Sequence, residues 1–120
     1  MTIDSYSTLG TAGLRVSPLE LGAMNFDDGG RGSAPRPRLR SSTTTSTPTE
    51  LIDTANHCNA VRSEETLGDY FEQHLGRRHR VALATKFGGT LHPSDSNAGG
   101  TGRKAIYTEL DESLRRLNTD

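Results

Sequence analysis

Two side chains of opposite charge, Asp53 and Lys86, stand where two short apolar segments of the chain end. Those segments, residues 51–55 and 81–86, have the length and composition of β-strands, and a helix-like stretch at residues 63–75 separates them. The order strand, helix, strand favours a parallel sheet. The carboxyl ends of neighbouring parallel strands meet at one edge, which is where α/β barrels carry their catalytic groups. The sequence therefore predicts a functional site around this carboxylate and this amine.

The helix between these strands has a clear predicted start and an apolar face. Ser63 is expected at the N-cap with Glu64 and Glu65 in the first turn, because a hydroxyl and carboxylates interact favourably with unpaired N–H groups. Apolar side chains that recur at every fourth position predict the buried face: Leu67, Phe71 and Leu75.

Further elements flank this unit. Residues 5–9 and 14–16 surround a glycine-bearing turn and predict a small hairpin, and residues 19–24 predict a short strand. Residues 103–117 predict a second helix. Its expected apolar stripe is Ile106, Leu110, Leu114 and Leu117. Its basic pairs are expected to lie on solvated faces: Arg103 with Lys104, and Arg115 with Arg116.

Composition limits the classes of function. The chain has 120 residues, enough for one domain but short of the roughly 250 of a complete (β/α)₈ barrel. A net charge of −1 argues against a nucleic-acid partner, and no apolar run approaches the length of a membrane span. The single cysteine fits a reducing compartment, so the cytoplasm is expected.

Residues 32–50 differ in kind from the rest. They join a Pro/Arg-rich stretch to a run of Ser and Thr, and Leu39 is their one large apolar side chain. Because no helix or strand period survives there, this segment is expected to be disordered.

Six short segments together resemble the beginning of an aldo-keto reductase. They are residues 9–17 (LGTAGLRVS), 21–24 (LGAM), 52–55 (IDTA), 63–68 (SEETLG), 84–86 (ATK) and 113–117 (SLRRL). Their order and spacing carry the resemblance more than any one of them. The resemblance implies the α/β class, as an incomplete (β/α)₈ TIM barrel with an N-terminal hairpin and about three β/α units. Residues 1–120 would then form a single partial domain.

The resemblance also implies NADPH-dependent reduction of aldehydes or ketones, with a small carbonyl compound as substrate. In the family, a Tyr gives a proton to the carbonyl oxygen, a Lys lowers the pKa of that phenol, an Asp holds the Lys, and a His orients the carbonyl. Matched by motif, Asp53 takes the Asp role and Lys86 the Lys role. Gly22, Ala23 and Met24, together with Asp53, would contact the cofactor. The His would come on a strand beyond residue 120.

Cys58 stands at the Tyr position and departs from the pattern. A thiol on one methylene falls short of a phenol by most of a ring's length, and it is a weak hydrogen-bond donor. Little or no turnover is therefore expected of this truncated chain. An alternative is a reactive thiolate favoured by a nearby Lys86. No metal is expected, since these residues match no zinc spacing: His57, Cys58, His74 and His79.

The family has an amphipathic helix where this chain has residues 32–50. If the reading frame over the codons of residues 41–48 is shifted back by one base, the new codons permit a helix-like mixture of apolar and polar residues. The Pro/Arg stretch shifts largely to Ala and Arg, which are good helix formers. One interpretation is therefore a segment translated out of frame, and the other is a genuine flexible linker. The underlying nucleotide sequence distinguishes the two.

Two further interpretations of the whole chain stay open beside the reductase. One is a non-catalytic fragment that docks onto a partner and binds no cofactor. The other is a product without function. Soluble expression with NADPH fluorescence quenching separates them. Quenching with carbonyl-dependent loss of NADPH supports the reductase, cooperative folding without cofactor binding supports the docking fragment, and failure to fold supports the product without function.

Overall fold

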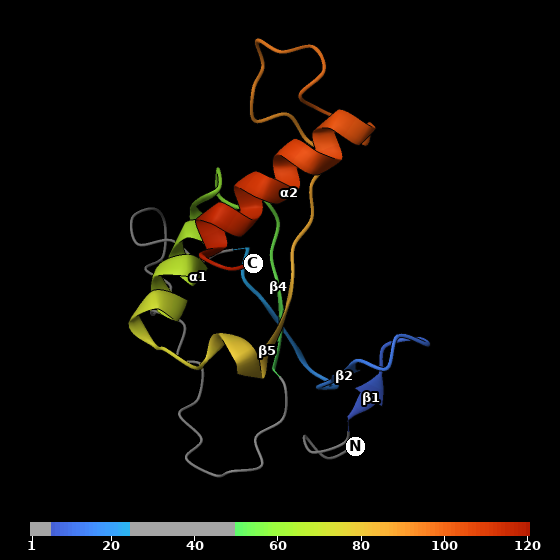
Figure 1. Ribbon diagram of the computed structural model, residues 1–120, viewed down its shortest axis with the longest axis vertical. Helices are drawn as coiled ribbons and strands as arrows, with labels where there is room; N and C mark the ends of the chain where they lie inside the picture. The colour runs from blue at the N-terminus through green and yellow to red at the C-terminus, as the bar shows by residue number, and fades with distance from the viewer. Residues whose placement is uncertain (1–5, 25–49) are drawn as a thin grey trace.

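The computed structural model describes residues 6–24 and 50–120 (Figure 1). The predictions for residues 32–50, both disorder and the reading-frame shift, lie outside these described residues except at Glu50. That residue begins a strand, so the predicted disorder is wrong at this position. In chain order the elements are β1 (Ser7–Thr8), β2 (Arg15–Val16), β3 (Glu20–Gly22), β4 (Glu50–Asp53), α1 (Arg62–Gln73), the 3₁₀ turn η1 (Arg78–Arg80), β5 (Val81–Ala84) and α2 (Arg103–Leu117).

A three-stranded parallel sheet, in the order β3-β4-β5, forms the centre of the described fold. The register pairs Gly22 with Asp53, and Asp53 with Ala84. Backbone hydrogen bonds continue the pairing of β4 with β5 past the strand ends. The N–H of Thr54 donates to the carbonyl of Ala84 at 2.9 Å, and that of Asn56 to the carbonyl of Lys86 at 2.9 Å. The predicted parallel α/β arrangement is confirmed.

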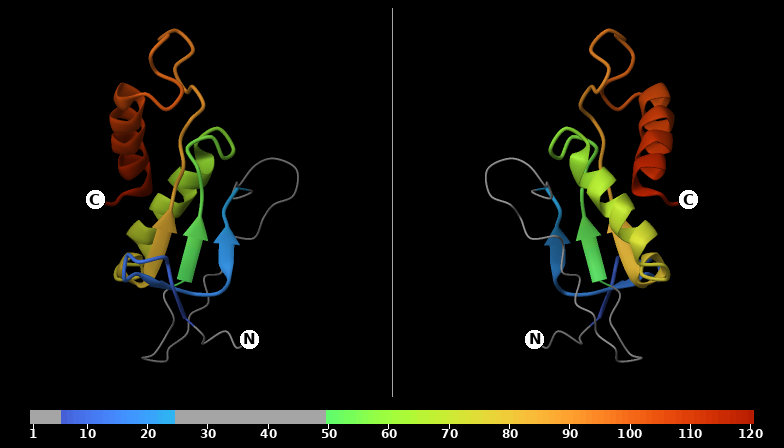
Figure 2. Two further views of the ribbon diagram at one scale, coloured as in Figure 1. Left: turned by 90° about the vertical axis from the view of Figure 1, so that its right-hand side faces the viewer. Right: turned by 90° about the vertical axis from the view of Figure 1, so that its left-hand side faces the viewer.

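The predicted N-terminal hairpin is also present. β1 and β2 pair antiparallel, with Ser7 opposite Val16, and Gly10 and Gly13 of the connecting turn adopt positive φ values of 57° and 74°. Left-handed backbone of this kind suits glycine because it lacks a Cβ. Figure 2 shows the hairpin near the amino ends of the parallel strands, away from the edge at which Asp53 lies.

α1 packs on one face of the sheet, and α2 packs against α1 while most of its length lies beyond the carboxyl ends of the strands (Figure 2). Leu117, the last residue of α2, contributes to the hydrophobic core. Burying each large apolar side chain contributes about 1.5–3 kcal/mol. A glycine allows the helices to approach closely, since a Cβ on Gly68 of α1 would lie 2.1 Å from the carbonyl oxygen of Arg116 in α2. The buried core consists of Ala23, Ile52, Leu67, Phe71, Val81 and Leu117.

The start and the end of α1 differ from prediction. Val61 is the N-cap, without a side-chain cap hydrogen bond, and Ser63 lies inside the first turn. The Ser63 hydroxyl instead donates to the carbonyl of Met24 at 3.3 Å, which ties α1 to the end of β3. Leu67 and Phe71 are buried as predicted, but Leu75 is 91% exposed because the helix ends at Gln73.

The buried face of α2 also differs from prediction, although the bounds of this helix agree. Ile106 and Leu110 are 41% and 46% exposed, and of the expected stripe only Leu117 is fully buried. The buried residues of the helix are instead Ala105, Glu109, Ser113 and Leu117. The prediction that Arg115 and Arg116 are both solvated was wrong for Arg116, whose side chain is 6% exposed. Polar partners inside the fold, described below, explain this rotation of the helix.

The turn that leads into α1 is strained. Asn59, Ala60 and Val61 have φ values of 50°, 48° and 70°, which are left-handed conformations for three consecutive residues other than glycine. Such conformations cost about 1–2 kcal/mol for residues with a Cβ, and a β-branched residue tolerates them least.

We expect Val61→Gly to stabilise the protein by about 1 kcal/mol, because glycine adopts this φ without a steric penalty. Urea unfolding followed by circular dichroism measures the change. Glu72→Gly is the matched control on the exposed side of α1, where glycine should instead destabilise by about 1 kcal/mol. A loss of stability in both variants would contradict the conclusion that the backbone at Val61 is strained.

Candidate functional site

Asp53 and Lys86 meet at the carboxyl edge of the sheet, as predicted. Asp53 is the last residue of β4, and Lys86 lies two residues past the end of β5. The ammonium Nζ of Lys86 donates a hydrogen bond to Oδ2 of Asp53. The Asp53 and Lys86 side chains are 32% and 55% exposed, so solvent or a ligand can reach the pair.

The other predicted site residues surround this pair to different extents. Gly22 lies beside Asp53 in the β3–β4 register, and the N–H of Ala23 donates to the carbonyl of Asp53 at 2.8 Å. The Ala23 side chain belongs to the core, whereas Met24 is 62% exposed. Cys58 is a half-buried free thiol whose N–H donates to the carbonyl of Ala55 at 3.0 Å. Its side chain shares none of the described hydrogen bonds at the pair.

The side chain of His57, in the loop after β4, lies against Gly89, in the loop after β5. A Cβ added to Gly89 would lie 1.6 Å from Nε2 of His57, so the imidazole occupies the space that any larger residue at position 89 would need. The contact brings His57 next to the segment that follows Lys86. Among the described residues, no cluster of three His, Cys, Asp or Glu side chains could hold a metal ion.

A buried ion pair lies beneath the edge of the sheet, between α1 and α2. Glu64 is fully buried, and its Oε2 accepts a hydrogen bond from Nε of Arg116 at 2.7 Å. Its Oε1 accepts another from the hydroxyl of Thr85 at 2.7 Å. Arg116 also donates to Glu112 at 3.1 Å and to Ser113 at 3.3 Å. Charges taken out of water need partners of this kind, because an unpaired buried charge is strongly destabilising.

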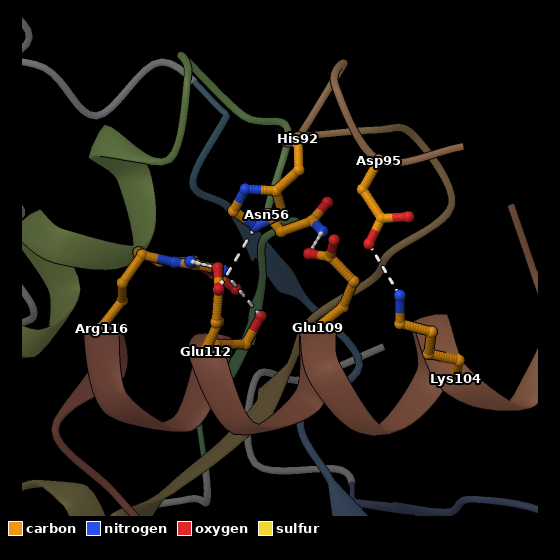
Figure 3. A network of polar contacts seen from close by, with 9 residues as sticks. Asn56, His92, Asp95, Lys104, Glu109, Glu112 and Arg116 are labelled. Atoms are coloured by element: carbon orange, nitrogen blue, oxygen red, sulfur yellow. Dashed lines mark hydrogen bonds and ion pairs between the residues drawn. The ribbon is translucent and has the colours of Figure 1, made fainter. Parts of the chain in front are cut away.

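A second polar contact joins the loop after β4 to α2 (Figure 3). Nδ2 of Asn56 donates to Oε2 of Glu109 at 2.6 Å, and both residues are buried. One turn further along α2, Glu112 lies 3.3 Å from Nε2 of His92. Near the start of the helix, the ammonium of Lys104 donates to Asp95 and holds the pKa of that carboxyl below its usual value.

This buried polar layer was not predicted from the sequence, although the sequence carries a signal for part of it. Glu64 precedes Leu67 and Phe71 by three and seven residues, which places its carboxylate on the apolar face of α1. An acidic residue on such a face needs a buried cation. Its partner Arg116 lies 52 residues away, and helical periodicity alone cannot identify a partner at that distance.

A model of the Aldo/keto reductase family matches residues 18–120. The chain belongs to the aldo-keto reductase family. It is 34% identical over 119 residues to an aryl-alcohol dehydrogenase from Pestalotiopsis microspora, covering 92% of this chain and 31% of that protein. It is 32% identical over 120 residues to norsolorinic acid reductase B from Dothistroma septosporum, covering 92% and 30% respectively. The chain thus spans about a third of the length of these curated relatives.

Solved structures show the same partial correspondence. PA4992 from Pseudomonas aeruginosa is similar with a TM-score of 0.68 and 28% identity, over 98% of this chain and 44% of that one. The aldo-keto reductase AKR11C1 from Bacillus halodurans, in its holo form, is similar with a TM-score of 0.66 and 26% identity, over 96% and 37%. The predicted family and the predicted partial barrel fold are therefore confirmed. None of the described helices is long and apolar enough to cross a membrane.

Removing the cation of the buried pair is expected to destabilise the protein strongly. Arg116→Met should lower the free energy of unfolding by about 3 kcal/mol or more, because the Glu64 carboxylate then stays buried without its charged partner. Urea unfolding measures the change. Lys104→Met is the matched control, since it breaks an exposed pair with Asp95 and should leave stability nearly unchanged. Equal effects in the two variants would contradict the role of burial.

Proposed function

We propose that the site around Asp53 and Lys86 serves the NADPH-dependent reduction of aldehydes or ketones. The observation that carries the proposal is the hydrogen-bonded pair of these two residues at the carboxyl edge of parallel strands, in a chain of the aldo-keto reductase family. Relatives whose names include an aryl-alcohol dehydrogenase and a norsolorinic acid reductase support chemistry between alcohols and carbonyl compounds. Family membership favours this function over a binding module without cofactor.

The chemistry divides between the cofactor and the residues of this chain. When bound, NADPH supplies the hydride for the carbonyl carbon. The carbonyl oxygen then needs a proton and a positive environment while negative charge develops on it. The Lys86 ammonium provides that charge, and Asp53 limits the positions of the long Lys86 side chain by accepting its hydrogen bond.

In this proposal the nicotinamide end of such a cofactor would lie at the carboxyl edge of the sheet, beside Asp53. A Cβ added to Gly22 would meet no atom within 4 Å, so the strand end beside Asp53 is open on the side of the missing side chain. Gly22, the exposed Met24 and Asp53 would line this opening. Ala23 would contribute its backbone, since its side chain is in the core. A small carbonyl compound is the substrate class that the proposal implies, and the cytoplasm is the compartment.

Cys58 weakens the proton step in this chain. A thiol on one methylene cannot reach as far as a phenol, and it donates hydrogen bonds poorly. We therefore infer low turnover for the chain as it stands.

Cys58→Tyr is expected to raise carbonyl-dependent consumption of NADPH by at least about tenfold, since a positioned general acid contributes about 10²–10⁴-fold. The assay follows NADPH absorbance with an aromatic aldehyde as substrate, and quenching of NADPH fluorescence reports binding separately.

Lys86→Met in the Cys58→Tyr background is the control, and it should remove the gain while leaving binding of the cofactor within a few-fold. Binding without any gain in turnover from Cys58→Tyr would contradict the assignment of position 58. No binding of NADPH by any variant would contradict the proposed function itself.

A further inference from the structure

The main chain at Lys86 is held by two hydrogen bonds, one in the plane of the sheet and one on the side of the helices. In the plane of the sheet, the carbonyl of Lys86 accepts a hydrogen bond from the N–H of Asn56 at 2.9 Å. On the side of the helices, the hydroxyl of Thr85 donates to Oε1 of the buried Glu64 at 2.7 Å. Successive residues of an extended chain point to opposite faces, so Thr85 faces the helices while Lys86 faces Asp53. Each of the two residues that follow β5 therefore takes part in a hydrogen bond to another part of the fold.

The acceptor for Thr85 is itself held in place. Glu64 is fully buried, and its second oxygen accepts the hydrogen bond from Arg116, whose side chain is 6% exposed. Arg116 is held in turn by Glu112 and Ser113 on the same helix. Because each donor and acceptor in this series has a fixed partner, the Thr85 hydroxyl meets a carboxylate that has little freedom to move.

A second contact of α2, between Glu109 and Asn56, also helps to hold the main chain at Lys86. Asn56, whose N–H donates to Lys86, anchors its side chain on Glu109 at 2.6 Å. Figure 3 shows Asn56, Glu109, Glu112 and Arg116 along the face of α2 that is turned toward the sheet edge. The position of the Lys86 main chain therefore depends on α2 through two independent contacts.

We propose that Glu64 is a positioning residue for Lys86, acting through the hydroxyl of Thr85 and oriented by Arg116. The position of the Lys86 main chain affects the site because a shift of this main chain displaces the ammonium, at the end of a long flexible side chain, from Asp53. Errors of about 1 Å in such an arrangement reduce catalysis severely. The catalytic meaning of this inference rests on the proposed function, whereas the positioning itself does not.

Thr85→Val tests the inference, because it removes the hydroxyl, nearly preserves shape and leaves the pair of Glu64 with Arg116 intact. The chain has only two lysines, Lys86 and Lys104, so acetylation by a soluble activated ester, read by mass spectrometry, gives the reactivity of Lys86 with Lys104 as internal reference. We expect Thr85→Val to raise the ratio of Lys86 to Lys104 labelling by about twofold to fivefold, the range for losing an exposed ion pair.

Two variants separate positioning from general loosening of the fold. Thr85→Ser retains the hydroxyl and should restore the original ratio. Thr108→Val removes a hydroxyl from α2 that takes part in none of the described side-chain hydrogen bonds, and it should leave the ratio unchanged. An unchanged ratio in Thr85→Val, or an equal rise in Thr108→Val, would overturn the inference.

Hydrogen exchange on the unaltered chain makes the test independent of how well the variants fold. The Asn56 amide, which donates to Lys86, should exchange as slowly as the Thr54 amide inside the ladder and at least about tenfold more slowly than the Cys58 amide in the turn. Exchange at the rate of Cys58 would overturn the inference.

In the Cys58→Tyr background, adding Thr85→Val should lower kcat by about tenfold with little change in KM, because the ammonium is displaced and the binding surface is kept. Turnover absent from every variant, together with the expected labelling ratio, would reject the proposed function and leave the positioning intact. Turnover that is unaffected by Thr85→Val would overturn the catalytic part of the inference.

Discussion

The buried pair of Glu64 and Arg116 is the interaction on which the described structure depends most. It joins α1 to α2 where both meet the sheet, and the carboxylate continues to Thr85 at the end of β5. Breaking a buried charge pair costs about 3–5 kcal/mol, comparable to the loss of a large core side chain. In a chain with a small apolar core, one such pair determines how α2 lies against the sheet.

This constraint accounts for the orientation of α2. The helix would bury more apolar surface if Ile106 and Leu110 faced inward, yet both are about half exposed. Turning them inward would take Arg116 away from Glu64 and Glu109 away from Asn56, leaving buried polar groups without partners. The cost of such groups, about 1–3 kcal/mol each and more for charges, exceeds the gain from partly burying two aliphatic side chains.

Much of the fold could be predicted from the sequence because its signals are local. The hairpin, the parallel strands and both helices follow from turn residues and periodicity, and α2 begins and ends where it was predicted. The meeting of Asp53 and Lys86 followed from strand order, since the carboxyl ends of parallel strands share one edge. The roles of these two residues and of Cys58 stay predictions until activity is measured.

The parts that could not be predicted depend on contacts between distant residues. Arg116 was assigned to a solvated face because an Arg–Arg pair on a helix is usually hydrated, and nothing local identifies Glu64 as its partner. Leu75 continued the apolar period of α1, but the helix stops at Gln73 before reaching it. The strained turn before α1 was equally hidden, because Asn59, Ala60 and Val61 carry no glycine to indicate positive φ.

We conclude that the charge interaction between Glu64 and Arg116 holds α2 against the edge of the sheet. A double-mutant cycle with Glu64→Gln and Arg116→Met, measured by urea unfolding, tests this conclusion. Strong non-additivity is expected, with a coupling energy of about 2 kcal/mol or more, because each single change leaves the other charge buried. Additive effects of the two substitutions, within about 0.5 kcal/mol, would contradict it.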